Sequence, residues 1–264
     1  METNKRYNKI IKRITDIHTH YGSYAGHEFS PEEILEKVKK IGLKSIAIMP
    51  APEKGNNDEI PDNHKVLHLI ELAGEDIAII PILLVSPGMV KADPDFLMVE
   101  DIPYKIIKIH PYAHDWAMYN SLFEKAVIHA QYKNVPVMIH TGYDESSPEN
   151  HEWLYEKYPD VIFILAHAKP FDIAYKMMNK YSNVWIDLSF TDLEQLYVVQ
   201  EIIDHNRILF GTDLPINEIF YKHTSEEYYY LRIKEIIDNF NVELLLKWGK
   251  YNVKKLFCFA NPRS

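Results

Sequence analysis

Two histidines, His18 and His20, end a short apolar, β-branched run at residues 14–20. A strand places side chains i and i+2 on the same face, so both imidazoles point the same way and can bind one ion. Asp16 is expected on that face too, one step earlier in the strand. By itself the pair is equally compatible with two structural histidines near a strand end, so its meaning depends on whether the rest of the chain supplies further ligands.

Metal-binding and titratable side chains also stand at the ends of later apolar runs. They are Lys108 and His110 (run 104–110), His140 (135–141), His167 (161–168), Asp187 and Ser189 (183–189) and Asp213 (207–213). Imidazole and carboxylate groups are ligands for Zn²⁺ and other borderline divalent ions. Buried without a metal, these groups would be costly unless they were hydrogen-bonded to one another. We therefore expect a site for a divalent metal, with Zn²⁺ as the first candidate, as one or two ions.

The elements that would position these residues recur through the chain. Eight runs rich in Ile, Val and Leu occur at 14–20, 43–50, 77–85, 104–110, 135–141, 161–168, 183–189 and 207–213. Continuous apolar runs are typical of strands in a parallel sheet that is covered on both faces, and a helical pattern follows each run. Eight strand–helix units predict an α/β fold, a (βα)8 TIM barrel, with residues 1–264 as one domain. The alternative, an open doubly wound sheet, normally has a glycine-rich phosphate turn after its first strand, and the sequence contains no such motif.

Start and stop signals delimit the helices between these runs. Ser30, followed by proline and two glutamates, predicts a helix N-terminus, and Gly42 predicts its end. Further helices are predicted at 62–74, 117–133, 148–158, 170–181, 192–205 and 226–238, with a last pair near 241–258. The helical pattern is weakest between residues 86 and 103.

Composition excludes several classes of function. The net charge of −9 argues against nucleic acid or an anionic membrane as a partner. The first residues lack the apolar core of a signal peptide, and no apolar run approaches the length of a membrane span. The single cysteine, Cys258, excludes an intramolecular disulfide. These features predict a cytoplasmic protein whose partner is a small-molecule substrate.

The order of the motifs resembles the amidohydrolase superfamily, and most of all its amidohydrolase-2 branch, which includes the aminocarboxymuconate-semialdehyde decarboxylase relatives. The matching segments are DIHTHYG (16–22), IIKIHP (106–111), VMIHTG (137–142), FILAHAKP (163–170) and LFGTDLP (209–215). The tail YNVKKLF (251–257) is similar to the closing helix of that family. The resemblance covers residues 14–258, and it implies a metal-dependent enzyme.

The resemblance also implies roles for the site residues. The implied metal ligands are His18, His20, His140, His167 and Asp213. Of these, His167 would serve either a second ion or as an acid and electrostatic helper. In two-metal members the lysine that corresponds to Lys108 is carboxylated and bridges the ions, and one-metal members need no bridge. His110, which shares a strand face with Lys108, and Tyr143, in the loop after the fifth run, are the candidates for substrate binding.

The implied reaction is hydrolysis of an amide, ester, lactone or similar bond. Water bound to such a metal has a pKa near neutrality, and Asp213 would accept its proton and pass it to the leaving group. His167 or the metal would stabilise the oxyanion. Asp187 or Asp16 is expected to orient a ligand histidine. Barrels of this family often pair, so a homodimer is expected.

Three alternatives remain open from the sequence. A non-oxidative decarboxylase would use the same metal frame, and a Lys or Arg at the barrel mouth that binds a carboxylate would favour it. None of the five arginines directly follows a predicted strand, where a guanidinium fork would meet a dicarboxylate. Nuclease barrels of the TatD type use a glutamate where this chain has Lys108. A catalytically silent scaffold would lack one of the metal-ligating residues, and none of the expected ones is missing.

Other aromatic and histidine side chains give weaker expectations. The loop residues that could line a substrate pocket are Tyr21, Tyr24, His27, His114, Trp116, Tyr143 and Tyr221. His129 lies in an apolar helical stretch and is expected in the core. His151, His205 and His223 are expected to be solvated.

Overall fold

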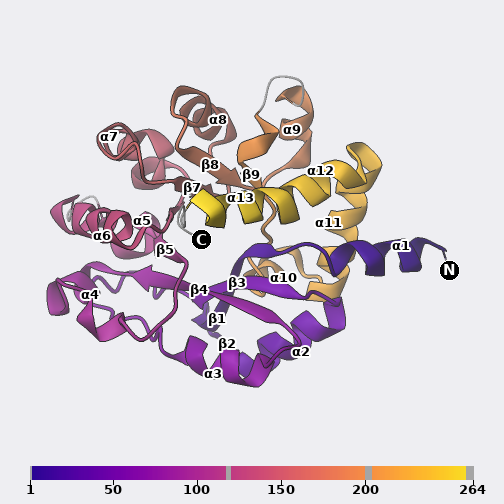
Figure 1. Ribbon diagram of the computed structural model, residues 1–264, viewed down its shortest axis with the longest axis horizontal. Helices are drawn as coiled ribbons and strands as arrows, with labels where there is room; N and C mark the ends of the chain where they lie inside the picture. Colours follow the sequence, from indigo (N-terminus) through magenta and orange to yellow (C-terminus); the bar gives the residue numbers. More distant parts are fainter. Residues whose placement is uncertain (1, 117–119, 200–203, 260–264) are drawn as a thin grey trace.

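Eight parallel strands form the centre of the structure, a computed structural model that describes residues 2–116, 120–199 and 204–259 (Figure 1). They are β1 (Asp16–Tyr24), β3 (Ser45–Pro50), β4 (Ala78–Val85), β5 (Ile106–Ile109), β6 (Val137–His140), β7 (Phe163–Ala166), β8 (Val184–Asp187) and β9 (Ile208–Leu209). Each strand pairs in parallel with the next one in this series. Every apolar run that was predicted as a strand overlaps one of them, so the eight strand predictions are confirmed.

Backbone hydrogen bonds between β1 and the segment after β9 close the sheet. The amide of Asp213 donates to the carbonyl of His18 (2.9 Å), and the amide of His20 donates to the carbonyl of Leu214 (2.7 Å). A parallel bridge joins Thr19 to Leu214 at the same place. The predicted (βα)8 barrel is thereby confirmed, and its closure brings Asp213 directly beside the first strand.

Helices pack around the outside of this barrel (Figure 1). They are α2 (Pro31–Ile41), α3 (Lys65–Ala73), α4 (Pro87–Ala92), α6 (Asn120–Lys133), α7 (Glu152–Lys157), α8 (Phe171–Lys180), α9 (Leu193–Val199) and α11 (Ser225–Asn239). Two short helices, α5 (Pro111–His114) and α10 (Ile216–Tyr221), follow β5 and β9 at the end where these strands end. The start of α2 is as predicted, because Ser30 Oγ accepts a hydrogen bond from the amide of Glu33 (3.3 Å). Gly42 ends α2 with φ of 92°, a left-handed conformation that favours glycine.

The structure divides two of the predicted helical regions into shorter pieces. The predicted helix 148–158 consists of a 3₁₀ turn at Pro148–His151 followed by α7, and the weak region 86–103 contains α4 and a 3₁₀ turn at Leu97–Val99. Parts of the predicted helices 117–133 and 192–205, at residues 117–119 and 200–203, lie outside the described residues. No helix in the described part of the chain is both long and apolar enough to cross a membrane.

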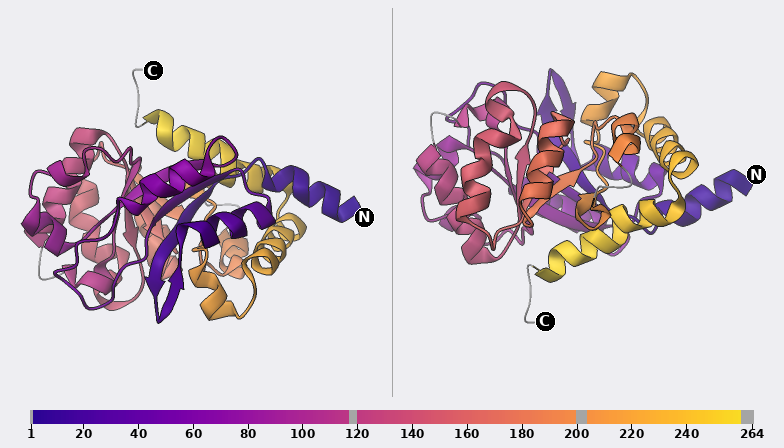
Figure 2. Two further views of the ribbon diagram at one scale, coloured as in Figure 1. Left: turned by 90° about the horizontal axis from the view of Figure 1, so that it is seen from below. Right: turned by 90° about the horizontal axis from the view of Figure 1, so that it is seen from above.

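A hairpin and the C-terminal helices mark opposite ends of the barrel (Figure 2). The short strand β2 (His27–Phe29) pairs antiparallel with the end of β1 and projects with it from one end. Helices α12 (Val242–Leu246) and α13 (Asn252–Phe259), joined by a π-helical turn at Lys247–Tyr251, lie at the other end and confirm the last predicted pair. The sequence patterns predict neither β2 nor the first helix, α1 (Glu2–Ile11).

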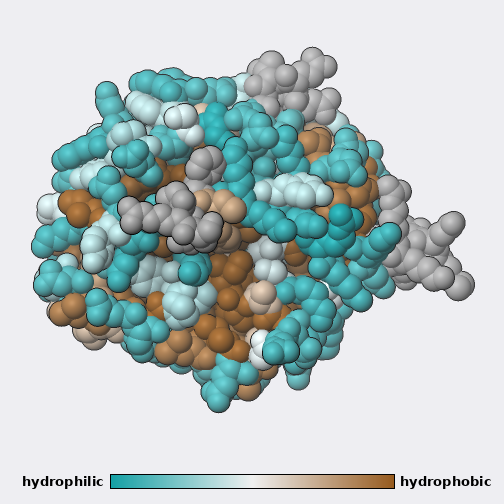
Figure 3. All heavy atoms as spheres, viewed as in Figure 1, coloured by the Kyte–Doolittle hydropathy of each residue, from teal (hydrophilic) through white to brown (hydrophobic). Residues whose placement is uncertain are grey.

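Apolar side chains fill the inside of the barrel below the strand ends. This inner cluster consists of Ile17, Ala47, Met49, Ile82, Ile106, Met138, Ile164, Ala166, Trp185 and Leu209 from the strands, with Val253 and Leu256 from α13. Figure 3 views the end that α13 crosses, where hydrophobic side chains gather toward the middle and hydrophilic ones toward the rim. The inside of the barrel is therefore packed with apolar side chains rather than open.

We predict that Gly249→Ala destabilises the barrel. A Cβ at Gly249 would lie 2.8 Å from Ile14 Cβ, and the Gly249 carbonyl already accepts a hydrogen bond from the amide of Thr15 (2.7 Å). Overpacking of this kind costs about 1–3 kcal/mol, which urea unfolding would measure as a lower midpoint at an unchanged slope. Gly142→Ala is the control, because its Cβ would meet Ser146 Cβ at 3.7 Å. Equal stability of the two variants would contradict the prediction.

His151 is buried, which corrects the expectation that it is solvated. Its side chain is 7% exposed, and its ring lies 5.3 Å from that of Phe123. His151 lies three residues before Leu154 and four before Tyr155, which are both buried, so it belongs to the buried face of this segment at ordinary helical spacing. Burial lowers the pKa of His151 to about 4. Of the other two, His205 is partly buried and His223 is exposed.

We predict that His151 makes the stability of the metal-free protein depend on pH. Its folded-state pKa lies below the usual value of about 6.5, so the unfolded chain gains a proton first as the pH falls. The stability is therefore complete above pH 6.5 and is lost toward pH 4. Between pH 7 and pH 5, His151→Leu should lose about 2 kcal/mol less unfolding free energy than the wild type. The exposed His223→Leu should behave like the wild type, and an identical pH dependence of all three proteins would refute the prediction.

Candidate active site

A cavity of about 570 Å³ opens at the C-terminal ends of the strands. The side chains singled out from the sequence as ligands, catalytic groups or substrate contacts all line it: His18, His20, Lys108, His110, His140, Tyr143, His167 and Asp213. They come from β1, β5 and β6 and from the segments that follow β5, β6, β7 and β9. Barrel enzymes carry their chemistry at this end, so the cavity is the candidate active site.

A β-bulge in β1 decides which of its side chains face the cavity. The register between β1 and β3 shifts just after Asp16, and such an extra residue breaks the two-residue alternation of side chains. His18 and His20 line the cavity, whereas Asp16 lies behind the sheet, where Thr212 and Tyr229 of α11 donate hydrogen bonds to its carboxylate. The expectation that Asp16 shares the face of the two histidines is therefore wrong.

Asp16 instead ties the two closing strands together from behind. Its Oδ1 accepts hydrogen bonds from the amides of His18 (3.0 Å) and Thr212 (3.1 Å). Burial raises the pKa of Asp16 to about 8 in spite of these bonds. One buried carboxyl group thus sets the separation between the backbone at His18 and the backbone just before Asp213.

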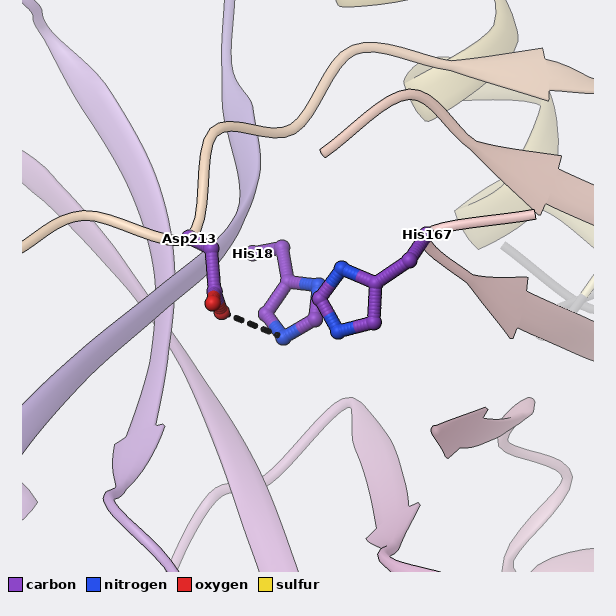
Figure 4. A group of neighbouring side chains, drawn as sticks. All are labelled: His18, His167 and Asp213. Carbon is purple, nitrogen blue, oxygen red and sulfur yellow. Dashed lines mark ion pairs between the residues drawn. The ribbon is translucent and has the colours of Figure 1, made fainter. Parts of the chain in front are cut away.

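His18 lies between two carboxylates, of which Figure 4 draws Asp213. Its Nδ1 is 3.0 Å from Asp187 Oδ2, and its Nε2 is 3.1 Å from Asp213 Oδ1. Burial lowers the pKa of His18 well below its usual value, so the imidazole is neutral and carries one N–H. With that N–H donated to Asp187, the lone pair of Nε2 faces the lone pairs of Asp213. A cation held by both atoms would remove this repulsion, so the arrangement fits a metal ion.

Three further histidines, His20, His140 and His167, lie close to His18 and Asp213 in the cavity. His20 Nε2 lies 2.9 Å from Asp213 Oδ1, and His140 Nδ1 lies 3.1 Å from His167 Nε2. One ligand atom each of His18, His167 and Asp213 lies within 4.8 Å of the others. Burial also lowers the pKa values of His140 and His167 well below the usual value. Neutral imidazoles with one carboxylate are a donor set that suits Zn²⁺.

Ser189, which follows β8, contacts both His18 and His167. Its Oγ lies 2.9 Å from His167 Nδ1 and 3.1 Å from His18 Nδ1, and its carbonyl lies 3.3 Å from His167 Nδ1. Because a carbonyl can only accept, Nδ1 of His167 carries the hydrogen and Nε2 presents its lone pair. This tautomer favours a ligand role for His167 over a donor role.

Lys108 and Asp213, which also contact His18, have shifted pKa values. Lys108 is 1% exposed, and burial lowers the pKa of its ammonium to about 8. Its Nζ lies 3.3 Å from His18 Nε2. Burial alone would raise the pKa of Asp213, but the adjacent His18 and His20 outweigh it, and the pKa is lowered. Asp213 is therefore an ionised carboxylate at neutral pH.

Two of the strand-end residues have left-handed backbones, with φ of 70° at His167 and 63° at Asp213. Side chains other than glycine rarely adopt this conformation, and it concentrates at functional sites. The carbonyl of His167 accepts a hydrogen bond from Thr191 Oγ1 (3.0 Å). That bond, with the one from the Asp213 amide to the His18 carbonyl, holds both turns in place.

The two residues predicted to bind substrate differ in their surroundings. The His110 ring stacks on that of His140 with centroids 3.8 Å apart, and its Nδ1 accepts a hydrogen bond from the amide of Ala113 at the start of α5. These contacts hold the His110 ring in the cavity wall, and its role in substrate binding stays a prediction. Tyr143 is 74% exposed and lies at the mouth.

Only some of the aromatic and histidine loop residues that were expected to line a substrate pocket do so. Tyr24 and Tyr143 line the cavity, whereas Tyr21, His114 and Trp116 are buried and His27 is exposed on β2. Tyr221 stands outside the lining, with its ring stacked on that of Phe190. The sequence analysis missed several lining residues, namely Pro52, Tyr112, Thr141, Lys169, Phe190, Ile216 and Phe220. Of these only Lys169, two residues after a strand-end histidine, carried a signal that could have found it.

The chain belongs to the amidohydrolase family. The sequence model of that family, the amidohydrolase-2 branch, matches residues 107–238. This match confirms the resemblance seen in the motifs and makes the protein an enzyme of a metal-dependent family. No curated protein sequence matches the chain significantly.

Solved structures of low sequence identity share the fold. An uncharacterised TIM-barrel protein from Bordetella bronchiseptica has a TM-score of 0.66 and 14% identity, over 94% of this chain and 99% of that one. A 4-oxalomesaconate hydratase from Rhodopseudomonas palustris has a TM-score of 0.62 and 14% identity, over 94% and 97%. A 5-carboxyvanillate decarboxylase from Sphingomonas paucimobilis has a TM-score of 0.60 and 10% identity, over 93% and 99%. At these identities the likeness supports the barrel and leaves the reaction open.

We predict that Asp187→Asn weakens metal binding without unfolding the protein. The substitution keeps the shape of the side chain but removes the charge that holds the Nδ1 hydrogen of His18. Loss of such a partner typically lowers metal affinity about 10- to 100-fold, which competition with a chromophoric chelator would measure for Zn²⁺. Asp192→Asn, on an exposed residue before α9, is the matched control. Equal Zn²⁺ affinity of the two variants would be evidence against this role of Asp187.

Proposed function

We propose that the protein is a metal-dependent hydrolase that attacks a carbonyl-type centre, an amide, ester or lactone, in a small-molecule substrate. The observation that carries this proposal is that His18 Nε2 lies 3.1 Å from Asp213 Oδ1 in a cavity at the barrel mouth. Membership of the amidohydrolase family supports it as well. The ion that we propose is Zn²⁺, bound as one or two ions.

The proposed ligands of the ion are His18, His20, His140, His167 and Asp213. A divalent ion bound among them supplies Lewis acidity, which polarises a carbonyl group and makes water easier to deprotonate. Asp187 and Ser189 orient two of these imidazoles from behind, since they contact the Nδ1 atoms that do not face the cavity.

Asp213 is proposed to carry the proton. As an ionised carboxylate it accepts a proton from the attacking water and then delivers it to the leaving atom, so the group is restored after each turnover. Its Oδ1 lies 2.9 Å from His20 Nε2, so this carboxylate stays beside the proposed ligands while it exchanges the proton. His167 remains a candidate for charge stabilisation, but its tautomer makes the ligand role the better supported one.

The role of Lys108 depends on the number of ions. If two ions were bound, the resemblance implies that a carboxylated Lys108 would help to hold them, and the lowered pKa of about 8 supports this because carboxylation needs a neutral amine. With one ion, Lys108 remains an ammonium group 3.3 Å from His18 Nε2. A mass increase of 44 Da on Lys108 under CO₂ would distinguish the two states.

A non-oxidative decarboxylase on the same frame is the second candidate. A cationic side chain at the mouth was the feature expected to favour it, and Lys169 lines the cavity. Release of CO₂ rather than of an alcohol or amine from a carboxylate substrate would decide for this alternative. Location in the cytoplasm, a homodimer and one domain over residues 1–264 stay predictions.

We predict that Asp213→Asn abolishes turnover and leaves the fold intact. The amide cannot accept the proton of the attacking water, so kcat should fall about 10²- to 10⁴-fold. Initial rates on a panel of amides, esters and lactones would measure this, with circular dichroism as the check on folding. Asp192→Asn should retain the wild-type rate. Unchanged turnover of Asp213→Asn would refute the assignment.

We predict that wild-type protein purified without chelators contains one or two divalent ions per chain and that His18→Ala contains less than half as much. His18 contacts both Asp213 and Asp187, so its removal disrupts the centre of the ligand set. Elemental analysis of both proteins, with the exposed His223→Ala as the control, would test this. A wild-type chain that binds no divalent metal, even on reconstitution, would overturn the proposed function.

A further inference from the structure

A lysine outside the predicted ligand set, Lys169, faces the candidate active site. It lines the cavity and is half-buried, two residues after His167 in the turn that follows β7. Its amide donates a hydrogen bond to Thr141 Oγ1 (3.0 Å), and Thr141 Oγ1 in turn donates to the carbonyl of Ala166 (2.6 Å). These bonds attach the turn to β7 and to the end of β6, so the lysine is carried by the barrel rather than by a free loop.

The ammonium group of Lys169 is available to a ligand. Within the described part of the chain, its Nζ makes no hydrogen bond and no ion pair, and it lies 5.5 Å from the ring centroid of Phe190. Lys108, the other lysine of the cavity, is nearly fully buried against His18. Asp213 is the one carboxylate among the described lining residues, and His18 and His20 already contact it. The cavity therefore offers one free positive charge, which favours an anionic substrate.

A row of aromatic rings stands beside this charge. The Phe190 ring lies 5.7 Å from that of His167 and 5.5 Å from that of Phe220, and Phe220 lies 6.4 Å from Tyr24. Phe220 is 59% exposed. Large apolar rings that stay exposed at the mouth of a cavity are typical of ligand-binding walls. Neighbouring rings of the row are tilted by 55° to 87° against one another, so the row offers both faces and edges to an apolar part of a ligand.

We propose that Lys169 determines substrate specificity by binding a carboxylate that the substrate carries on an apolar body. One ammonium group matches one carboxylate, and the row of rings from His167 to Tyr24 matches the apolar body. This inference depends on the proposed function only for the position of the bond that reacts. The preference for an anion depends on Lys169 itself, so it can be tested without turnover.

Binding of two isosteric probes, 4-fluorobenzoate and 4-fluorobenzamide, tests this preference by ¹⁹F NMR titration of the metal-loaded protein. The wild type should bind the benzoate about 10-fold more tightly than the benzamide, because a hydrogen bond to a charged group adds about that factor or more. Lys169→Met should lose about 10-fold in benzoate affinity and little in benzamide affinity. Lys169→Arg should keep most of the benzoate affinity.

Lys176→Met is the matched control, because it removes the same charge from an exposed position on α8. It should bind both probes as the wild type does. Elemental analysis of the same samples separates the two proposals, since a wild type without metal contradicts the proposed function and leaves the comparison of variants valid. Benzoate affinity that is unchanged in Lys169→Met, or a wild type that does not prefer benzoate, would overturn the role of Lys169.

Discussion

The hydrogen bonds that close the barrel between β1 and the segment after β9 are the constraint on which the site depends. The amide of Asp213 donates to the carbonyl of His18, and Asp16 holds the backbone on both sides of this seam from behind the sheet. Because the two segments are separated by nearly the whole chain, no local structure could bring them together. Closure sets the distance between His18 Nε2 and Asp213 Oδ1, and the cavity is built around that distance.

Burial sets the charge states of the side chains at this junction between β1 and the segment after β9. The histidines at the strand ends lose contact with water, so their pKa values fall and their rings are neutral, which is the state that can bind a metal ion. Asp187 and Ser189 take up the ring nitrogens that face away from the cavity. The remaining lone pairs face one another and the Nζ of Lys108, which lies 3.3 Å from His18 Nε2, so they are directed at a position that favours a cation. Family membership and this local geometry thus lead to the same conclusion from independent observations.

Local sequence patterns predicted the elements well where one physical rule dominated. Apolar runs buried on both faces marked each strand, and Ser30 and Gly42 marked the ends of α2. They failed at two side chains. His151 was expected in solvent but is buried, three and four residues before the buried Leu154 and Tyr155, so the helical period itself indicates its buried face. The bulge in β1 moves Asp16 off the face of His18, and a two-residue period applied to the sequence cannot detect an extra residue.

The sequence by itself determined the barrel, its order of strands and the residues that would stand at the strand ends, because hydrophobic period and motif order are properties of the chain alone. Only the tertiary structure decided which of those side chains meet. It paired His18 with Asp213 and with Asp187, and it brought Lys169 to a wall formed by Phe190 and Phe220. The physical reason is that contact, tautomer and charge state depend on barrel closure and on exclusion of water, and both arise only when distant segments pack together.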